Sequence, residues 1–470
     1  MMHGQPLREE CGVFGVFGAD KAAANVLAGL SALQHRGQEG CGVAALEPTG
    51  RLSLRKGLGL VSHNFPTGSF RDHPGRSAIG HVRYGTSGGG ELDNVQPFLF
   101  HRDTHDFAVV HNGNIVNTEE LKIELERMGT LFRSSSDSEI LGHLVHSLSV
   151  GSEGLNSHSL KRALNLIDGA FSFLVLTPDR LYACRDRYGF RPLSLGRLGN
   201  GYAVASETCA LHAVGAQVLR DVQPGEVLEI GPEGITSSFF AADRRNAMCA
   251  MEYIYFARPD SDIEGVNVHT YRVRSGQILF RESPVDADMV IGVPDSGLSG
   301  AIGYARASGL PLETGLIKNF YTGRTFIQPN QSLRITGVRM KLTPIRSVVQ
   351  GKRLVVMDDS IVRGTTSKQI VRMLREAGAA EIHLRITSAP LRHPCYYGVD
   401  ISTEAELISA RMDVDEVCRY IGADSLAFLS EAGMLEAGRR TDLCMACFND
   451  KYPTALYSHA GERDSGSSPE

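Results

Sequence analysis

The first residue with an evident chemical use is Cys11, which begins the stretch Cys11-Gly12-Val13-Phe14-Gly15 directly after two glutamates. A cut before Cys11 would place its thiol and a free α-amine on one terminal residue. That amine, with a pKa of about 7.7 to 8.0, could act as the general base for the thiol at neutral pH. By residue type alone, a cysteine beside valine and phenylalanine is more often a buried apolar side chain. The choice depends on the residues that accompany Cys11.

A second candidate site follows the apolar run 354–357, which is typical of a buried strand. Asp358 and Asp359 end this run, and a Gly/Thr-rich loop leads from them into a helical segment. In open α/β sheets, ligands bind at the carboxyl ends of strands, and a loop entering a helix offers N–H groups to a phosphate. An acidic pair alone is more often a solvated turn. The whole order of strand, acids and loop favours a site for ribose hydroxyls, Mg²⁺ and a phosphate.

This run resembles the ribose-phosphate signature of type I phosphoribosyltransferases. The resemblance implies that Asp358 and Asp359 contact the ribose of phosphoribosylpyrophosphate (PRPP) and that the loop binds its 5′-phosphate. The implied PRPP-binding residues of this run are Asp358, Asp359, Ser360, Arg363, Gly364, Thr365 and Thr366.

Two further segments extend this resemblance. The apolar run 289–293 and the Pro294-Asp295-Ser296-Gly297 loop look like the family's pyrophosphate loop, which implies that Ser296 joins the two aspartates in holding one Mg²⁺ per subunit. Segment 324–342 matches the mobile lid over bound PRPP, where Arg339 and Lys341 would meet phosphate. The alternative for those two charges is a solvated loop.

Three segments of the N-terminal half accompany Cys11. A site for free glutamine needs a cation for the α-carboxylate, an acid for the α-ammonium and donors for the oxyanion of a thioester-forming step. The segments contain all three kinds of group. They are Gly80-His81-Val82-Arg83-Tyr84-Gly85-Thr86, His111-Asn112-Gly113-Asn114 and Ser135-Ser136-Asp137-Ser138-Glu139.

Together with Cys11-Gly12-Val13-Phe14-Gly15 and segment 33–39, these segments resemble the glutaminase domain of N-terminal-nucleophile amidotransferases. The resemblance implies that Arg83 pairs the carboxylate, Asp137 the ammonium, and that Asn112 with the Gly113 N–H forms the oxyanion hole. Taken singly, Arg83 would be a surface ion pair, Asp137 a helix N-cap and Asn112-Gly113 a hairpin turn. Their order along the chain favours the active site. Cys11 is then the nucleophile, and residues 1–10 are a propeptide.

A glutaminase domain followed by a PRPP-binding domain is the architecture of the glutamine PRPP amidotransferase family. The resemblance implies that ammonia released from glutamine passes inside the protein to C1 of PRPP and displaces pyrophosphate, giving 5-phosphoribosylamine at the start of purine synthesis. It also implies a homotetramer inhibited by purine nucleotides. The rival functions are an inactive PRPP-sensing regulator and another amidotransferase, such as an asparagine or glucosamine-phosphate synthase. The regulator would not need the glutamine-binding set, and the Asp358-Asp359 loop disfavours the other amidotransferases.

The Cys444-Met445-Ala446-Cys447 pair indicates zinc, a redox couple or chance. Members of the family with an iron–sulfur cluster take ligands from the segments that match Cys249, Cys395 and this pair. A Cys₄ set can hold a [4Fe-4S] cluster or Zn²⁺, and spacing does not separate the two. The resemblance favours one cluster per subunit, with a structural role. The other cysteines are expected to pack in cores; they are Cys41, Cys184, Cys209 and Cys418.

These sites require two kinds of domain. Residues 11–243 contain short β-branched and aromatic runs with glycine-rich turns and some helices, which predicts an α+β domain; the resemblance makes it an αββα N-terminal-nucleophile sandwich. From about residue 285 the chain alternates apolar strands with helices, which predicts a parallel α/β sheet. The resemblance makes residues 244–457 a type I phosphoribosyltransferase domain. Residues 458–470 are expected to be a disordered tail.

The composition excludes several other classes of protein. A net charge of −5 without a dense Lys/Arg block gives no reason to expect nucleic-acid binding. The first ten residues lack the apolar core of a signal peptide, and no apolar run approaches the roughly 18 residues that span a bilayer. We therefore expect a cytoplasmic enzyme without a disulfide framework.

Overall fold

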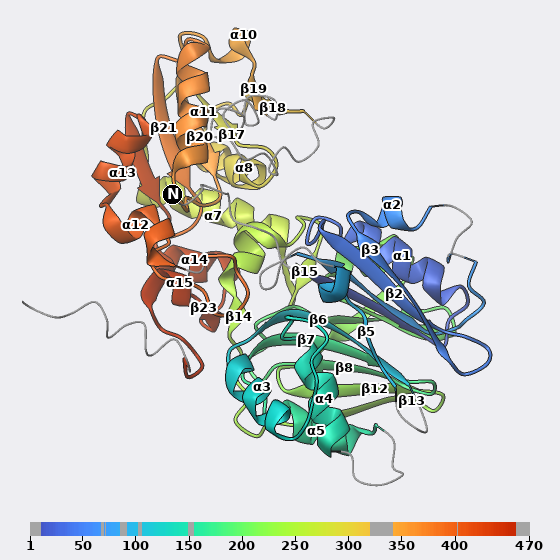
Figure 1. Ribbon diagram of the computed structural model, residues 1–470. Helices are drawn as coiled ribbons and strands as arrows, with labels where there is room; N and C mark the ends of the chain where they lie inside the picture. Colours follow the sequence, from blue (N-terminus) through green and yellow to red (C-terminus); the bar gives the residue numbers. More distant parts are fainter. Residues whose placement is uncertain are drawn as a thin grey trace, which may run out of the picture.

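The structure is a computed structural model that describes residues 11–66, 70, 72–84, 92–101, 106–148, 155–319, 342–401 and 403–456. The expected propeptide, the tail, and the lid residues Arg339 and Lys341 lie outside the described residues. The N-terminal part contains two stacked antiparallel sheets, and the C-terminal part is built on a parallel sheet (Figure 1).

Cys11 directly precedes a central strand of the first antiparallel sheet. In spatial order the strands of this sheet are β11 (Gln217–Asp221), β9 (Ser194–Leu198), β10 (Gly201–Ala205), β1 (Gly12–Phe17), β4 (Ala78–Arg83), β2 (Gly40–Leu46) and β3 (Leu52–Leu58). Both faces of β1 are covered: Val13 and Phe17 point to the other sheet, whereas Phe14 and Val16 pack toward the helices. This explains why β1 is apolar throughout instead of alternating.

The second antiparallel sheet lies on the first. Its strands in spatial order are β13 (Gly234–Phe239), β12 (Glu226–Gly231), β8 (Leu181–Arg185), β7 (Gly169–Leu176), β6 (Phe107–Ile115) and β5 (Phe98–Phe100). One apolar core fills the space between the two sheets. Two further cores lie under the helices on the outer faces, which are α1 (Ala22–Ala32) and α6 (Thr208–Ala213) on the first sheet, and α3 (Thr118–Arg127), α4 (Glu139–Leu148) and α5 (Ser157–Leu164) on the second. The predicted αββα sandwich is confirmed.

The C-terminal sheet is parallel, in the order β17 (Met289–Gly292), β20 (Arg353–Asp358), β21 (Glu381–Ile386) and β22 (Ser425–Phe428). Successive residues of β20 face opposite cores: Val355 and Met357 pack on the side of α7 (Val268–Glu282) and α8 (Gly297–Ser308). Leu354 and Val356 pack on the side of α11 (Thr365–Glu376) and α13 (Val414–Ile421). The expected parallel α/β sheet is confirmed, and helices cover both of its faces.

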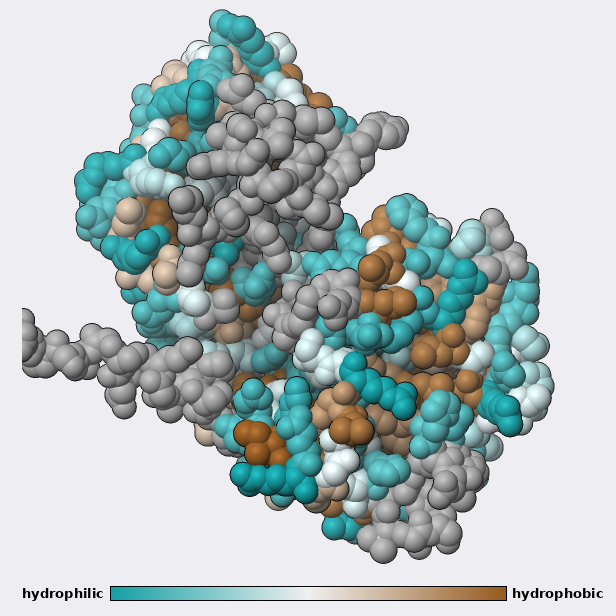
Figure 2. Space-filling model, in the orientation of Figure 1, coloured by the Kyte–Doolittle hydropathy of each residue, from teal (hydrophilic) through white to brown (hydrophobic). Residues whose placement is uncertain are grey.

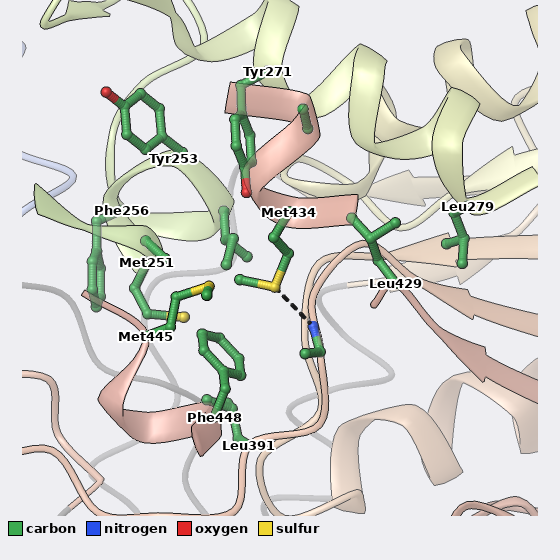
Figure 3. Packing of buried hydrophobic residues seen from close by; sticks show 14 of the residues in the cluster. Met251, Tyr253, Phe256, Tyr271, Leu279, Leu391, Leu429, Met434, Met445 and Phe448 are labelled. Carbon is green, nitrogen blue, oxygen red and sulfur yellow. Dashed lines mark hydrogen bonds between the residues drawn. The ribbon is translucent and has the colours of Figure 1, made fainter. Parts of the chain in front are cut away.

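The end of the chain returns to the joint between the two parts. Strand β14 (Met248–Cys249) pairs in parallel with β23 (Leu443–Cys444) and leads into the π-helix η2 (Glu252–Phe256). Figure 3 shows Met251 and Phe256 of this joint packed with Met434 of α14 (Glu431–Gly438) and with Phe448 of α15 (Ala446–Asn449). The joint and the C-terminal segments therefore share one core.

The remaining elements are short. They are α2 (Val61–Asn64), η1 (Leu92–Asn94), β15 (Asp262–Ile263), β16 (Val266–Asn267), β18 (Leu316–Lys318), β19 (Leu342–Pro344), α10 (Arg346–Val349), η4 (Glu404–Glu406) and α12 (Ile408–Arg411).

Helix α3 differs in detail from its prediction. The sequence favours an apolar face of Leu121, Ile123, Leu125 and Met128, but only the two leucines are buried. Asn117 occupies the expected N-cap position without capping the helix, because its side chain bonds the backbone of Leu166 and Asp168.

The molecular surface is of mixed polarity. On the face drawn in Figure 2, apolar residues form small separate groups among hydrophilic ones. Among the helices that the structure describes, none combines the length and apolar character needed to cross a membrane.

Candidate active sites

The Cys11 thiol lies at the start of β1 in the first sheet, beside the end of β4. Strands β1 and β4 are antiparallel with Gly12 opposite Val82, which places Cys11 next to Arg83 and Tyr84. The Cys11 sulfur is 3.5 Å from the Tyr84 carbonyl oxygen and 3.4 Å from the Tyr84 nitrogen. Cys11 is half-buried, unlike Cys41, Cys184 and Cys209, which are buried as expected for packing residues. Pairing of two strands therefore brings the candidate nucleophile and Arg83 together.

Asn112 and Gly113 lie in β6, which packs against β1 across the space between the sheets. Asn112 is fully buried, and neither polar atom of its side chain has a hydrogen-bond partner within the described chain. Burying an amide without partners is costly, so such a group indicates a site for a ligand. Gly113 has φ 145°, and a Cβ there would lie 2.0 Å from the Ala170 carbonyl oxygen, so only glycine fits.

Asp137 is placed beside β6 by the backbone of that strand. Its Oδ2 accepts a hydrogen bond of 2.9 Å from the Ile115 N–H, and its Oδ1 accepts one of 3.2 Å from the Ser138 hydroxyl. Burial raises the pKa of Asp137, but nearby His111 and these hydrogen bonds outweigh burial and lower the pKa below its usual value. Asp137 therefore stays ionised, as an acid that pairs an ammonium group must.

Two histidines support these residues, and neither was assigned a role from the sequence. His81 in β4 contacts the His111 carbonyl oxygen at 3.1 Å and so joins the two sheets beside Asn112. Burial, together with the charges of Arg83 and His111, lowers the pKa of His81 to about 3, so it is neutral. The His111 ring stacks on Phe173 at 4.4 Å and bonds the Ser138 hydroxyl. Each of the two motifs contains a histidine within a strand-like apolar run, and this was the signal in the sequence for a supporting role.

The second site lies at the carboxyl ends of β17 and β20, which are parallel neighbours. Asp358 ends β20 and Asp359 follows it, while Ser296 precedes α8 in the loop after β17. The Ser296 hydroxyl bonds Asp359, and the Ser360 hydroxyl donates to the same carboxylate at 2.5 Å. The parallel sheet thus brings together the three residues expected to hold Mg²⁺.

The two aspartates form a buried acidic pair. Burial and the charge of Asp359 raise the pKa of Asp358 well above its usual value. Burial also raises the pKa of Asp359, although bonds from Ser296 and Ser360 and the charge of Arg272 oppose the shift. Two adjacent buried carboxylates with a hydroxyl beside them are the oxygen donors that fit a divalent cation.

The loop after the acidic pair enters α11 through Gly364, which has φ 71° and lies at the N-cap position. Thr365 and Thr366 then begin a helix of 12 residues, whose first N–H groups and dipole suit a phosphate. Arg363 is paired with Glu406 at 2.9 Å, a contact that the sequence does not indicate. The glycine, the threonines and the helix therefore lie in the expected order.

The four candidate cluster cysteines come together at the joint. Cys249 lies opposite Cys444 in the β14–β23 pair, and burial together with the charges of Cys395, Cys249 and Cys444 raises the pKa of Cys447. Within the described ranges, no group of three or more His, Cys, Asp or Glu side chains is arranged to hold a metal ion. Iron–sulfur clusters are held by cysteine thiolates. Four neighbouring thiols are the donor type that such a cluster needs.

The segment that contains Cys395 also contacts the glutaminase strand. The Asn114 side chain donates a hydrogen bond of 3.0 Å to the Tyr396 carbonyl oxygen. A Cβ on Gly398 would lie 3.5 Å from the Gly113 carbonyl carbon. Strand β6 therefore contacts the segment that contains Cys395.

Comparison with known proteins shows the family to which the chain belongs. Residues 90–213 match the family model described as a glutamine amidotransferase domain. The chain is 51% identical to the amidophosphoribosyltransferase of Bacillus subtilis (strain 168) over 458 residues, which covers 96% of this chain and 95% of the relative. It is 46% identical to the amidophosphoribosyltransferase of Staphylococcus aureus (strain COL), with coverages of 96% and 92%.

Solved structures show the same relationship. A structure described as the allosteric regulatory enzyme of purine biosynthesis has a TM-score of 0.90 and 51% identity, with coverage of 95% of this chain and 97% of that one. A second, glutamine PRPP amidotransferase from B. subtilis complexed with ADP and GMP, has a TM-score of 0.89 and 50% identity, with coverages of 95% and 98%.

The fold and the two sites define a glutamine amidotransferase joined to a phosphoribosyltransferase. The chain belongs to the amidophosphoribosyltransferase family. It is an enzyme of the first step of purine biosynthesis, and the comparisons give no support to the alternative of an inactive PRPP-sensing regulator.

Proposed function

We propose that Cys11 cleaves glutamine and that the ammonia released is used at C1 of PRPP. The Cys11 thiolate attacks the side-chain amide carbon of glutamine, which leaves a glutamyl thioester and ammonia; water then hydrolyses the thioester to glutamate. The observation that carries this proposal is the buried, unpartnered Asn112 amide on the strand that faces β1. With the Gly113 N–H, it would donate to the oxyanion that forms during the attack.

The remaining polar groups would hold the substrate. Arg83, buried beside Cys11, would pair the α-carboxylate of glutamine, and the ionised Asp137 would pair its α-ammonium. The α-amine of Cys11 would take the proton of the thiol and give it to the departing ammonia. That role requires removal of residues 1–10, because the nitrogen of a peptide bond is not a base.

At the second site, ammonia would displace pyrophosphate from C1 of PRPP to give 5-phosphoribosylamine. The N-terminus of α11 with Gly364, Thr365 and Thr366 would bind the 5′-phosphate, and Asp358 and Asp359 the ribose hydroxyls. Ser296 and the two aspartates would hold Mg²⁺, which when bound neutralises charge on the pyrophosphate. Ser360 would keep Asp359 oriented, and Arg363, Arg339 and Lys341 would add positive charge toward the phosphates.

We further propose that Cys249, Cys395, Cys444 and Cys447 hold one [4Fe-4S] cluster. When bound, the cluster would serve as a cross-link, because the reaction includes no redox change. Its thiolates would fasten the joint at β14 to β23 and to the Cys395 segment, which supports Asn114.

Loss of this cluster should inactivate glutamine-dependent synthesis. We expect that exposure to air or an iron chelator removes iron, weakens the support of β6 and lowers glutamine-dependent activity in proportion to iron lost. Iron content and activity should be measured on the same anaerobically purified samples. A variant such as Cys418→Ser, which changes a cysteine outside the group, should keep both. Full activity in protein that has lost all its iron would contradict the proposal.

The oxyanion role gives a separate prediction. We expect Asn112→Ala to lower kcat for glutamine by about 10²–10³-fold, as for loss of one oxyanion donor elsewhere. The ammonia-dependent reaction should change little, because Asn112 lies in the other half. Steady-state kinetics with each nitrogen donor would measure both effects. Asn165→Ala is the control, because the Asn165 amide bonds the Phe240 carbonyl oxygen away from both sites; an equal loss in the two variants would indicate general damage instead.

We also propose domain limits, an assembly and a cellular location for the enzyme. We place the domain limits at residues 11–243 and 244–457. We propose a cytoplasmic homotetramer that purine nucleotides inhibit, in keeping with the relative solved with ADP and GMP.

The whole function can be tested with purified enzyme. Intact-mass and N-terminal analysis should show a chain that begins at Cys11. This protein should make phosphoribosylamine from PRPP with glutamine and also with ammonia, whereas uncut protein should use ammonia alone. Failure of the processed enzyme with both donors would refute the proposed function.

A further inference from the structure

Three buried polar side chains lie between the two antiparallel sheets of the glutaminase half. They are His81 of β4, Asn112 of β6 and Ser172 of β7, and each is fully buried. In the part of the chain that the structure describes, neither the His81 Nδ1, the Asn112 amide nor the Ser172 hydroxyl has a hydrogen-bond partner. Strand β4 packs against both β6 and β7. Because buried polar groups are normally paired, three such groups in adjoining strands require a physical explanation.

Asn112 and Ser172 are neighbours within the second sheet. The register of β6 and β7 places them directly opposite each other. Asn112 shares its face of β6 with Val110, and Ser172 shares its face of β7 with Leu174, and both apolar residues belong to the core between the sheets. The two polar side chains therefore point the same way, and opposite residues have Cβ atoms about 4.5–5.5 Å apart. Rotation of the Ser172 side chain, or one intervening water, brings its hydroxyl to the amide.

The oxyanion role determines which way round the Asn112 amide must lie. Nδ2 is the donor of the amide and Oδ1 is only an acceptor, so Nδ2 has to face the oxyanion. Oδ1 then points away from the oxyanion and needs a donor of its own, because a buried amide oxygen without one is costly. Without that donor, nothing favours this orientation over the reverse one, in which Oδ1 would repel the oxyanion.

His81 cannot be the donor to Oδ1. Its Nε2 lies 3.1 Å from the His111 carbonyl oxygen, which only accepts, so Nε2 carries the hydrogen of the ring. Burial lowers the pKa of His81 to about 3, which leaves the ring neutral and Nδ1 without a hydrogen. The Ser172 hydroxyl, in contrast, has a hydrogen to donate.

We propose that Ser172 is a positioning residue for the oxyanion hole. Its hydroxyl donates to Oδ1 of Asn112 and so keeps Nδ2 directed at the oxyanion. Ser172 acts through Asn112 and not on glutamine itself. The role assigned to Ser172 rests on the proposed function, in which Asn112 stabilises the oxyanion.

The test is Ser172→Ala in the processed full-length enzyme. We expect kcat for glutamine hydrolysis to fall about tenfold, the order of effect of one hydrogen bond. KM should stay within about threefold, because Arg83 and Asp137 still bind the substrate, and ammonia-dependent synthesis within about twofold. Glutamate γ-semialdehyde, whose aldehyde carbon adds the Cys11 thiol to form a tetrahedral adduct, should bind more weakly by the factor that kcat loses.

A double variant distinguishes action through Asn112 from an independent effect. If Ser172 acts through Asn112, adding Ser172→Ala to Asn112→Ala should lower kcat by less than about twofold further. If the two residues act separately, the two losses should multiply.

An isosteric pair of variants tests the hydroxyl itself. Ser172→Thr keeps the hydroxyl and should keep kcat within about threefold of wild type. Ser172→Val has the same shape without the hydroxyl and should lose as much as Ser172→Ala. If Ser172→Ala fails to fold, the comparison of these two variants decides the result.

Ser194→Ala is the matched control. Ser194 is also a buried serine in a strand of the glutaminase half, but its hydroxyl has a partner, the Asp221 carboxylate at 2.6 Å. We expect this control to keep the wild-type kcat and the wild-type affinity for the aldehyde.

Two results would overturn the role of Ser172. One is an unchanged kcat in Ser172→Ala, or in Ser172→Val, while Asn112→Ala is impaired. The other is a double variant in which the two losses multiply. Failure of the proposed function would be seen separately, as an unchanged kcat in Asn112→Ala.

Discussion

Cys11→Ala should lose at least about 10³-fold of its glutamine-dependent synthesis, as expected when the nucleophile of covalent catalysis is removed. Ammonia-dependent synthesis should continue, because Asp358, Asp359 and α11 lie in the other half of the chain. The Cys11 side chain is small and half-buried, and its sulfur lies 3.4–3.5 Å from the Tyr84 backbone, so alanine should disturb the fold little. Both rates should be measured on one preparation.

Cys41→Ala provides the control for this experiment. Cys41 is in β2 of the same sheet, and burial raises the pKa of its thiol to about 11, which makes it a poor nucleophile. We expect this variant to keep glutamine-dependent activity, although it can lose some stability by leaving a small cavity. Retention of glutamine use in Cys11→Ala, or its loss in Cys41→Ala, would contradict the assignment.

Asp359→Asn should lower synthesis with either nitrogen donor by roughly 10²–10³-fold, because the variant removes charge from a site proposed to bind Mg²⁺ and ribose. Cleavage of glutamine should remain measurable, because Cys11, Asn112 and Asp137 are unchanged. Assays of phosphoribosylamine and of glutamate on the same samples would separate the two effects. Asp286→Asn, at the opposite end of β20 where Asp286 pairs with Arg353 at 2.6 Å, is the matched control.

The same variant has a second expected effect, on stability. Because the folded-state pKa of Asp359 is raised, the folded protein without Mg²⁺ binds a proton more tightly than the unfolded chain does. The contribution of Asp359 to the free energy of unfolding therefore rises as pH falls from neutral toward that pKa. Asp359→Asn should unfold at a higher urea concentration than wild type at pH 7 and should flatten this pH dependence. An equal free energy of unfolding of wild type and Asp359→Asn across this pH range would contradict the raised pKa.

The sequence predicted the residues of the two sites better than it predicted what supports them. Cys11 and Arg83 could be paired from motifs, and β1 and β4 indeed place them side by side. The buried ion pair between Arg36 and Glu252 could not be foreseen, because 216 positions separate these residues and no local pattern relates them. The pairing of Arg363 with Glu406 was likewise missed, because it depends on how η4 packs against the loop that follows β20.

The fold was predictable where a continuous apolar run indicates an element that is buried on both faces. Residues 354–357 of β20 are all apolar, and this run was recognised as a buried strand. Helix α3 was less well predicted because its apolar residues do not all fall on one stripe. Leu121 and Leu125 are one turn apart and are buried, whereas Ile123 points elsewhere and is 47% exposed. Sequence spacing alone does not show how wide the covered face of a helix is.

The contact between Asn114 and Tyr396 and the pairing of β14 with β23 have a consequence for synthesis of the chain. During translation, Cys11 and β6 are synthesised early, whereas Tyr396 and β23 are synthesised close to the end of the chain. We therefore expect a nascent or truncated chain to be unable to complete its first catalytic centre. Such a dependence would keep unfinished molecules from releasing ammonia before they contain an acceptor site for it.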